Sequence, residues 1–223
     1  MGGYVLDHSF ASAVAAFRPS LGIPDHRSPS VLTARRSQRF HERVARAKQR
    51  QVTTDRLFLA IVPPPEVALQ IADLAGRLRI GHELTGKPLE GEHFHVTLCH
   101  VGDGVGLPPE VVATTMERAA SVAMPSFKVA FDRVMSFRNG AFVLCGDESV
   151  IGLEVLQQRL SDALDDRPAQ ARRFTPHLTM LRDSHLVPEH EIEPISWTVK
   201  DVVFVHSLHG KTTHRHLARL PLG

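Results

Sequence analysis

The sequence predicts an α+β protein with largely antiparallel sheets. Two features carry this prediction: short amphipathic helices alternate with apolar strand-like segments, and Asn139-Gly140 is a two-residue turn typical of a β-hairpin. A third feature limits the choice of fold. No glycine-rich phosphate loop follows any of the strand-like segments, which disfavours a doubly wound nucleotide-binding fold.

The first half of the predicted body holds two strands and two helices. A buried strand over 56–62 ends at Pro63-Pro64-Pro65, and these prolines open a helix. A loop over 81–92 precedes a strand over 94–101, which we expect Gly102-Asp103-Gly104 to end. A second helix begins at Pro108-Pro109. We expect the two helices to bury apolar residues at helical spacing: Val67, Ile71, Leu74, Leu78, Val112, Met116 and Ala119.

The second half is richer in strands. Apolar residues alternate over 127–131, and the Asn139-Gly140 turn joins 134–137 to 141–145. A third helix over 149–164 places Leu153, Leu156 and Leu160 on one face. The remaining strands are predicted at 174–181, 197–205 and 217–220.

Length and composition are those of an ordinary globular protein. Of the 223 residues, 43% are hydrophobic and 22% charged, and no apolar run approaches the length of a membrane span. Residues 1–52 hold nine of the 26 basic and three of the 24 acidic side chains, so residues 53–223 hold 17 basic and 21 acidic ones. A body with this balance excludes a uniformly basic nucleic-acid surface, and any phosphate must be bound locally.

Residues 1–52 are predicted to be a basic extension, partly disordered or helical, and residues 53–223 the folded domain. A basic helix is expected over 32–51. Beside a solvated helix or tail, three interpretations of the extension stay open: an organellar presequence, an RNA-contacting arm, and a start codon assigned too far upstream. Because the first residues lack a secretory signal, and Cys99 and Cys145 fit buried reduced thiols, we expect a cytoplasmic monomer with no membrane contact.

One short pattern occurs twice, as His95-Val96-Thr97-Leu98 and His177-Leu178-Thr179-Met180. Each copy sits in a strand-like segment, where alternate side chains share a face, so each histidine lies beside its threonine. The intervening apolar residues turn toward a core. One histidine among 14 is usually structural, whereas the repetition in apolar surroundings favours a functional role.

Two imidazoles suit acid–base catalysis, because their unperturbed pKa is about 6.5. We predict His95 and His177 as catalytic residues, one accepting a proton from water and the other protonating the leaving oxygen; the sequence leaves open which is which. Thr97 and Thr179 are predicted to bind phosphoryl oxygens. Arg182 adds a permanent cation to this phosphate site, although strict alternation points it away from His177, so it needs a strand end or a bulge.

A metal centre is the competing chemistry. His93 and His95 form a His-x-His pair with His100 nearby, and four more histidines crowd the C-terminus: His206, His209, His214 and His216. No acidic residue accompanies them at a recognisable ligand spacing, so we predict neither a metal nor a cofactor. Cys99, on the predicted face of His95, is a weaker candidate nucleophile, since no base and orienting group accompany it.

Over about residues 55–221 the chain resembles the two-histidine (2H) phosphoesterases, in particular the 2′-5′ RNA ligase or RNA 2′,3′-cyclic phosphodiesterase family. The resemblance rests on the entry strand 56–63, on the first pattern followed by Gly102-Asp103, and on the second within 174–182. It implies a bilobal fold with pseudo-twofold symmetry, in which each lobe brings one His-x-Thr strand to a central cleft.

The resemblance further implies metal-independent opening of a 2′,3′-cyclic phosphate to a 2′-phosphomonoester, with reversible 2′-5′ ligation in some members. RNA ends or cyclic nucleotides would then be the partners. His100 and the segment 213–216 depart from residues that relatives often carry, and the one tyrosine, Tyr4, lies in the extension, so a base would stack on Phe, Trp197 or His. Two alternatives stay open: a non-catalytic nucleotide-binding or RNA-binding module, and an enzyme for another cyclic phosphate.

Overall fold

The computed structural model describes residues 54–164, 174–208, 210–211 and 213–223. The predicted extension and its helix therefore lie outside the described residues. The elements follow in the order β1 (Asp55–Ile61), α2 (Pro65–Gly81), η1 (Gly91–His93), β2 (Val96–Gly104), α3 (Pro109–Ala120), β3 (Phe127–Ser136), β4 (Ala141–Cys145), η2 (Glu148–Val150), α4 (Ile151–Leu164), β5 (His177–Arg182), β6 (His190–Val199), β7 (Asp201–Leu208) and β8 (Thr213–Pro221).

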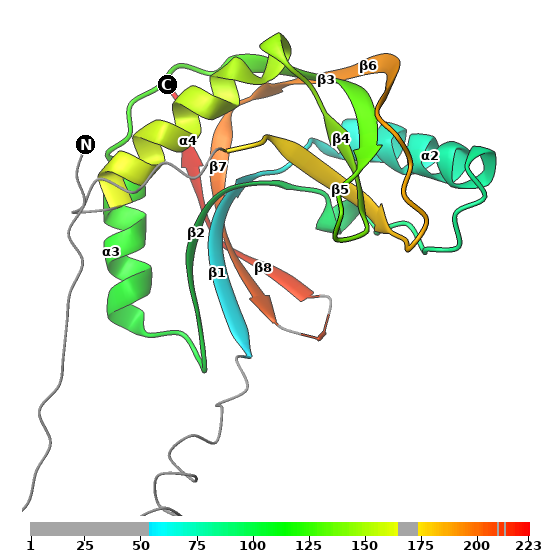
Figure 1. Ribbon diagram of the computed structural model, residues 1–223. Coiled ribbons are helices and arrows are strands. Elements are labelled where there is room, and N and C mark those ends of the chain that lie inside the picture. Colours follow the sequence, from blue (N-terminus) through cyan, green and yellow to red (C-terminus); the bar gives the residue numbers. More distant parts are fainter. Residues whose placement is uncertain (1–53, 165–173, 209, 212) are drawn as a thin grey trace, which may run out of the picture. The chain divides into compact units, whose positions relative to one another are not determined.

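These strands form two four-stranded sheets (Figure 1). The first has the order β2-β1-β7-β8 and the second β5-β4-β3-β6, and all six pairings are antiparallel. The predicted α+β class with largely antiparallel sheets is confirmed. The strands that carry the two histidine patterns, β2 and β5, are edge strands of different sheets and contact each other.

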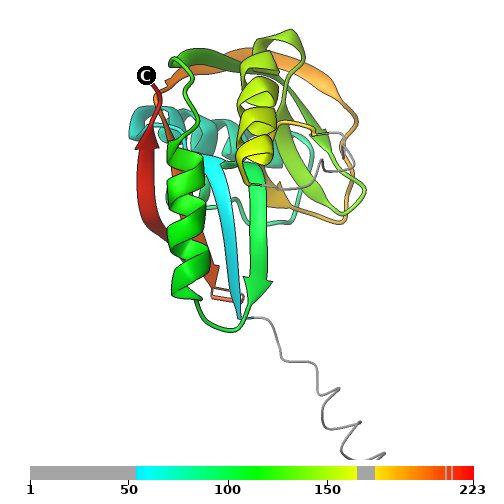
Figure 2. The ribbon, with the colours of Figure 1, turned by 90° about the vertical axis from the view of Figure 1, so that its left-hand side faces the viewer.

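One apolar core joins the two sheets and the helices. α2 packs against β5 and β6 of the second sheet, although it follows β1 of the first. α3 packs against β8, and α4 against both β2 and β3; Figure 2 shows α3 lying over the first sheet. Most of the helical residues predicted to face inward are buried or pack on the core, and so are both cysteines.

The end of β2 differs from the prediction. The strand does not stop before Gly102-Asp103-Gly104 but includes all three residues. β1 is long enough to pair with them, since Asp55 lies opposite Gly104 and Arg56 opposite Asp103. An ion pair from Arg56 Nε to Asp103 Oδ1, 2.8 Å long, reinforces this last pairing. Glycine weakens a strand, but here the partner strand decides where the pairing ends.

The single strand predicted over 197–205 is wrong, because β6 and β7 are separate strands that meet at Lys200. The periodicity did not reveal β6, whose first half is polar, contains Pro194 and is mostly exposed. β6 lies at the edge of the second sheet, where proline and exposed polar residues are tolerated. Its buried residues all lie in the second half of the strand and alternate along it: Ile195, Trp197 and Val199.

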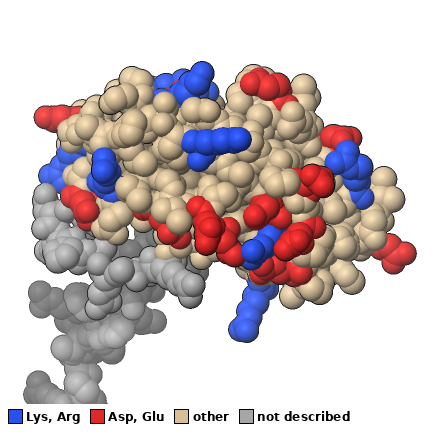
Figure 3. Space-filling model, turned by 90° about the horizontal axis from the view of Figure 1, so that it is seen from above, with Lys and Arg blue, Asp and Glu red and all other residues tan. Residues whose placement is uncertain are grey.

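The described surface carries both signs of charge. On the face seen in Figure 3, Lys and Arg side chains are scattered among Asp and Glu side chains and form no continuous basic area. Among the described residues, no helix is both long and apolar enough to cross a membrane. On the face seen in Figure 3, a phosphate would therefore meet local groups rather than a broad positive field.

Candidate active site

The two His-x-Thr segments each place their polar side chains on one face of a sheet. His95, predicted within a strand over 94–101, stands directly before β2, which begins at Val96, whereas His177 is the first residue of β5. Thr97 pairs with Ala60 and Thr179 with Val143, and paired residues share a face. We call these the histidine face of the first sheet and of the second sheet.

Both histidines are held by the same backbone contact. The Nδ1 atom of His95 lies 2.7 Å from the carbonyl oxygen of His93, and that of His177 lies 2.7 Å from the carbonyl oxygen of Thr175. A carbonyl only accepts, so Nδ1 carries the hydrogen in each ring. In the neutral form of each ring, Nε2 then carries no hydrogen and is the atom that can accept one. Sequence reasoning missed these partners because a carbonyl two residues upstream leaves no mark in the residue types.

β5 carries a bulge directly after its threonine. Consecutive residues of β4 pair with Leu181 and Thr179, so Met180 is the extra residue. Met180 and Leu181 are both buried, and Arg182 returns, exposed, to the face that carries His177. The bulge that Arg182 needs in order to share this face is therefore present.

β2 carries the corresponding bulge. Consecutive residues of β1 pair with Cys99 and Thr97, so Leu98 is the extra residue. The bulge turns Cys99 into the core, with its Sγ atom 3.5 Å from Ser161 Oγ. The expectation that Cys99 shares a face with His95 is wrong, because simple alternation does not hold across a bulge. The buried position argues against Cys99 as a nucleophile.

Aromatic rings flank each histidine. The ring of Phe58 on β1 lies 5.1 Å from that of His95, and the ring of Phe137 after β3 lies 4.8 Å from that of His177. His214 on β8 lies 5.1 Å from His95 in an edge-on arrangement. The prediction noted His214 only as one of many histidines. The strand register explains this position: His214 pairs with Ser207 and Ser207 with Arg56, which lies two residues from Phe58 on the same face of β1.

The surroundings lower the pKa of two of these histidines. Burial lowers the pKa of His95, and the nearby His177, His93 and His216 lower it further against the opposing backbone hydrogen bond. Burial also lowers the pKa of His214 to about 4, with His95 as the next contribution. Both rings are therefore neutral at pH 7. The strands that carry the two histidine patterns, β2 and β5, contact each other.

These shifts predict a loss of stability in mild acid. The unfolded chain takes up a proton on His214 near pH 6.5, whereas the folded chain resists protonation down to about pH 4. The free energy of unfolding should therefore fall by on the order of 1–3 kcal/mol as the pH drops through this interval. Urea unfolding between pH 7 and 4 measures it. The variant His214→Phe should show a shallower decline, and an unchanged decline would contradict this origin.

The other C-terminal histidines divide between the two faces of the first sheet. His206 lies on the opposite, buried face, where its Nε2 atom is 2.6 Å from Asp55 Oδ1. His216 shares the histidine face but is exposed, and His209 lies outside the described residues. Within the described ranges, no group of three or more His, Cys, Asp or Glu side chains is arranged to hold a metal ion.

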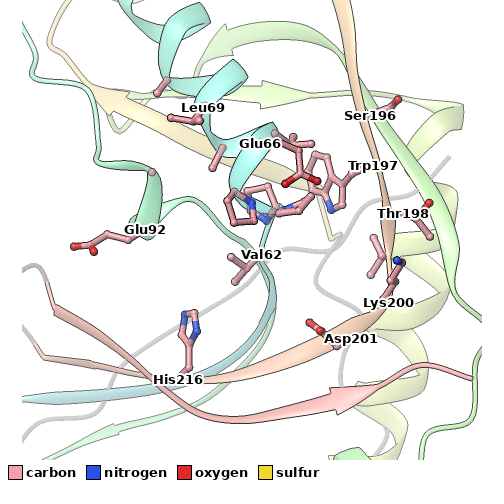
Figure 4. Close-up of a pocket in the computed structure, with 18 of the residues that line it drawn as sticks. Val62, Glu66, Leu69, Glu92, Ser196, Trp197, Thr198, Lys200, Asp201 and His216 are labelled. Carbon is pink, nitrogen blue, oxygen red and sulfur yellow. The ribbon is translucent and has the colours of Figure 1, made fainter.

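A groove of about 1030 Å³ lies where α2 begins. Figure 4 shows it between the first turn of α2, the end of β6 with Trp197, and His216 on β8. Trp197 is 6% exposed and stacks on Phe131 at 5.4 Å, so it offers little surface to a base. The groove is otherwise lined by proline and aliphatic side chains and by charged residues of both signs. The charged residues are Glu66, Glu90, Glu92, Asp201, Lys200 and Arg219.

The fold resembles several solved structures. Escherichia coli LigT complexed with 3′-AMP is 25% identical, with a TM-score of 0.61 over 76% of this chain and 98% of that chain. The LigT complex with NADP+ is 27% identical, with a TM-score of 0.60 over the same shares. TT0787 of Thermus thermophilus, 20% identical over 75% of this chain and 97% of that chain with a TM-score of 0.61, supports the fold alone. A comparison with curated protein sequences finds no match.

Two antiparallel sheets, each with one His-x-Thr strand at its edge, define a protein of the two-histidine phosphoesterase class. The family model of the 2′-5′ RNA ligase superfamily matches residues 63–211, and the chain belongs to this superfamily. Its members are phosphoesterases, which supports an enzyme that acts on phosphodiester bonds.

Proposed function

We propose that this protein opens 2′,3′-cyclic phosphates at RNA ends or in nucleotides to 2′-phosphomonoesters, with His95 and His177 as its acid–base pair. The observation that carries the proposal is the matched hydrogen bond from Nδ1 to a carbonyl in both rings. This hydrogen bond fixes the orientation of each ring and leaves its Nε2 atom for proton transfer. The proposed reaction needs one proton acceptor and one proton donor, and the two rings supply them.

The lowered pKa of His95 suits the base, because this ring is neutral at pH 7 and its Nε2 can accept a proton. In the proposed step a water oxygen bonds to phosphorus while His95 takes its proton. The bond from phosphorus to the 3′ oxygen breaks, and His177 gives a proton to that oxygen. The net change is the addition of one water, and both rings return to their first state by exchanging protons with solvent.

Two threonines and one arginine complete the proposed site. Thr97 and Thr179 share the faces of their histidines, so each hydroxyl can donate to a phosphoryl oxygen. Arg182 brings a guanidinium, which binds phosphate in a forked geometry. These donors would stabilise the charge that builds on the phosphoryl oxygens in the transition state.

The comparisons support a nucleotide as the substrate. LigT has been crystallised with 3′-AMP, NADP+, ATP and phosphate, so a related fold binds nucleotide phosphates. In this chain the groove beside His216 has the volume of a small-molecule site. A nucleoside seated in it would lie on the same side of the first sheet as His95. If a 5′ hydroxyl takes the place of water as the nucleophile, the same step would join it to the phosphorus as a 2′-5′ diester, while the bond to the 3′ oxygen breaks and that oxygen takes the proton of His177.

The test is the turnover of 2′,3′-cyclic mononucleotides, of RNA ending in a cyclic phosphate and of ADP-ribose cyclic phosphate, in buffer with EDTA. We expect a 2′-phosphate product and a bell-shaped dependence of kcat/KM on pH. Loss of activity with the chelator, or a 3′-phosphate product, would contradict the proposal. Binding without turnover would instead identify a non-catalytic module.

A further inference from the structure

The internal repeat is longer than the His-x-Thr pattern. Six residues correspond, from His95 to His100 and from His177 to Arg182. Both copies contain the bulge at the fourth residue, Leu98 or Met180. In both, the bulge brings the sixth residue back to the histidine face. His100 therefore occupies in the first sheet the place that Arg182 occupies in the second.

The register fixes this position of His100. It pairs with Phe58, whose ring contacts His95, and its side chain is 52% exposed. Thr97 pairs with Ala60, two residues further along β1, so His100 lies about 7 Å from the threonine along the strand. In Figure 1 β2 and β5 diverge from the middle of the molecule. His100 and Arg182 each lie three residues beyond the threonine of their own strand.

The contacts of His100 with Asp103 and Arg56 leave one nitrogen of its ring, Nδ1, able to bind a ligand. Its Nε2 atom lies 2.9 Å from Asp103 Oδ1. Arg56 binds the same carboxylate with two hydrogen bonds of 2.8 and 3.0 Å, and these bonds, with that from His100, hold the pKa of Asp103 below its usual range. Arg56 and Asp103 cancel each other's charge. Within the described residues, no hydrogen bond engages Nδ1 of His100.

We infer that His100 binds a second phosphate of an RNA substrate, one nucleotide away from the phosphate that reacts. An imidazolium carries a hydrogen on each nitrogen, so Nε2 stays on Asp103 while Nδ1 donates to a phosphate oxygen. Asp103 acts as a positioning residue for the ring. This inference rests on the proposed function and names its substrate class: an oligonucleotide end gains a contact that a cyclic mononucleotide lacks.

Two ligand pairs test the inference. Turnover is measured on a 2′,3′-cyclic mononucleotide and on a trinucleotide with a terminal cyclic phosphate. Binding is measured on the corresponding 2′-phosphate products. For His100→Ala we expect kcat/KM and affinity to fall about 5–20-fold for the trinucleotide, and to stay within about twofold for the mononucleotide. His100→Arg should restore the trinucleotide values, since it places a guanidinium where the repeat places one in β5.

Arg215→Ala serves as the matched control, because it removes an exposed cation from the opposite face of the same sheet. It should affect both ligands equally and weakly. An equal loss on both ligands in His100→Ala, or no loss on the trinucleotide, would overturn the role of His100. Binding of the 2′-phosphate products is measured separately from turnover. The role of His100 can therefore be tested even if the protein binds these products without cleaving the cyclic phosphates. A protein that binds neither ligand would overturn the proposed function as well.

Discussion

Replacing His95 or His177 by asparagine should lower kcat on a 2′,3′-cyclic nucleotide by about 10²–10⁴-fold, with the fold intact. The asparagine amide can keep a hydrogen bond to the carbonyl that now holds Nδ1, but it supplies no group that exchanges protons near pH 7. The double variant should lose little more than either single one, because the two rings act in the same step. Single-turnover kinetics with thermal melting separates this loss from unfolding.

His190→Asn is the matched control for these variants. The Nδ1 atom of His190 also lies near a carbonyl oxygen two residues upstream, 3.1 Å from that of Pro188. Unlike His95 and His177, however, His190 is followed two residues later by an isoleucine and not by a threonine. Its replacement should leave kcat within about twofold of the wild type. Full activity in both His95→Asn and His177→Asn would remove the basis for acid–base catalysis by this pair.

Gly86→Ala should cause the largest loss of stability among single methyl additions at the described glycines. A Cβ atom at Gly86 would lie 2.0 Å from the carbonyl oxygen of Arg182, which is backbone and has little room to move. The backbone amides of Thr85 and Gly86 both donate to Asp183 Oδ2, at 2.6 and 2.7 Å, and Leu89 donates to the bulge carbonyl of Met180. This loop therefore holds the end of β5 in place.

Overpacking of this kind costs about 1–3 kcal/mol or more, and each kcal/mol lowers the Tm of a domain of this size by about 2–4 °C. Calorimetric melting measures the change. Because the clash is with the carbonyl of Arg182, the variant should also bind phosphate-bearing ligands more weakly. Gly76→Ala is the control, since a Cβ atom there meets nothing within 4 Å and alanine favours the interior of α2. A wild-type Tm for Gly86→Ala would contradict the packing described.

The helices and most strands could be predicted because their signals are local. α2 follows from three prolines and apolar residues at helical spacing. Asn139-Gly140 predicted the β3–β4 hairpin, but the two-residue turn is wrong: the amide of Phe137 donates to the carbonyl of Ala141, which leaves three loop residues, and only the glycine has a positive φ, of 81°. β6 escaped because an edge strand with exposed polar residues has no hydrophobic period. The packing of α2 on the second sheet has no local signal at all, since it joins segments that are distant in the sequence.

For the site, the sequence alone determined that two imidazoles each share a face with a threonine, because strand alternation is a property of the chain itself. Only the tertiary structure decided which further residues join them. Bulges depend on the partner strand, and they turn Cys99 inward while bringing His100 and Arg182 onto the histidine faces. The approach of His214 to His95 depends on how β8 pairs with β7. Such contacts arise between strands, so the pattern within one strand does not contain them.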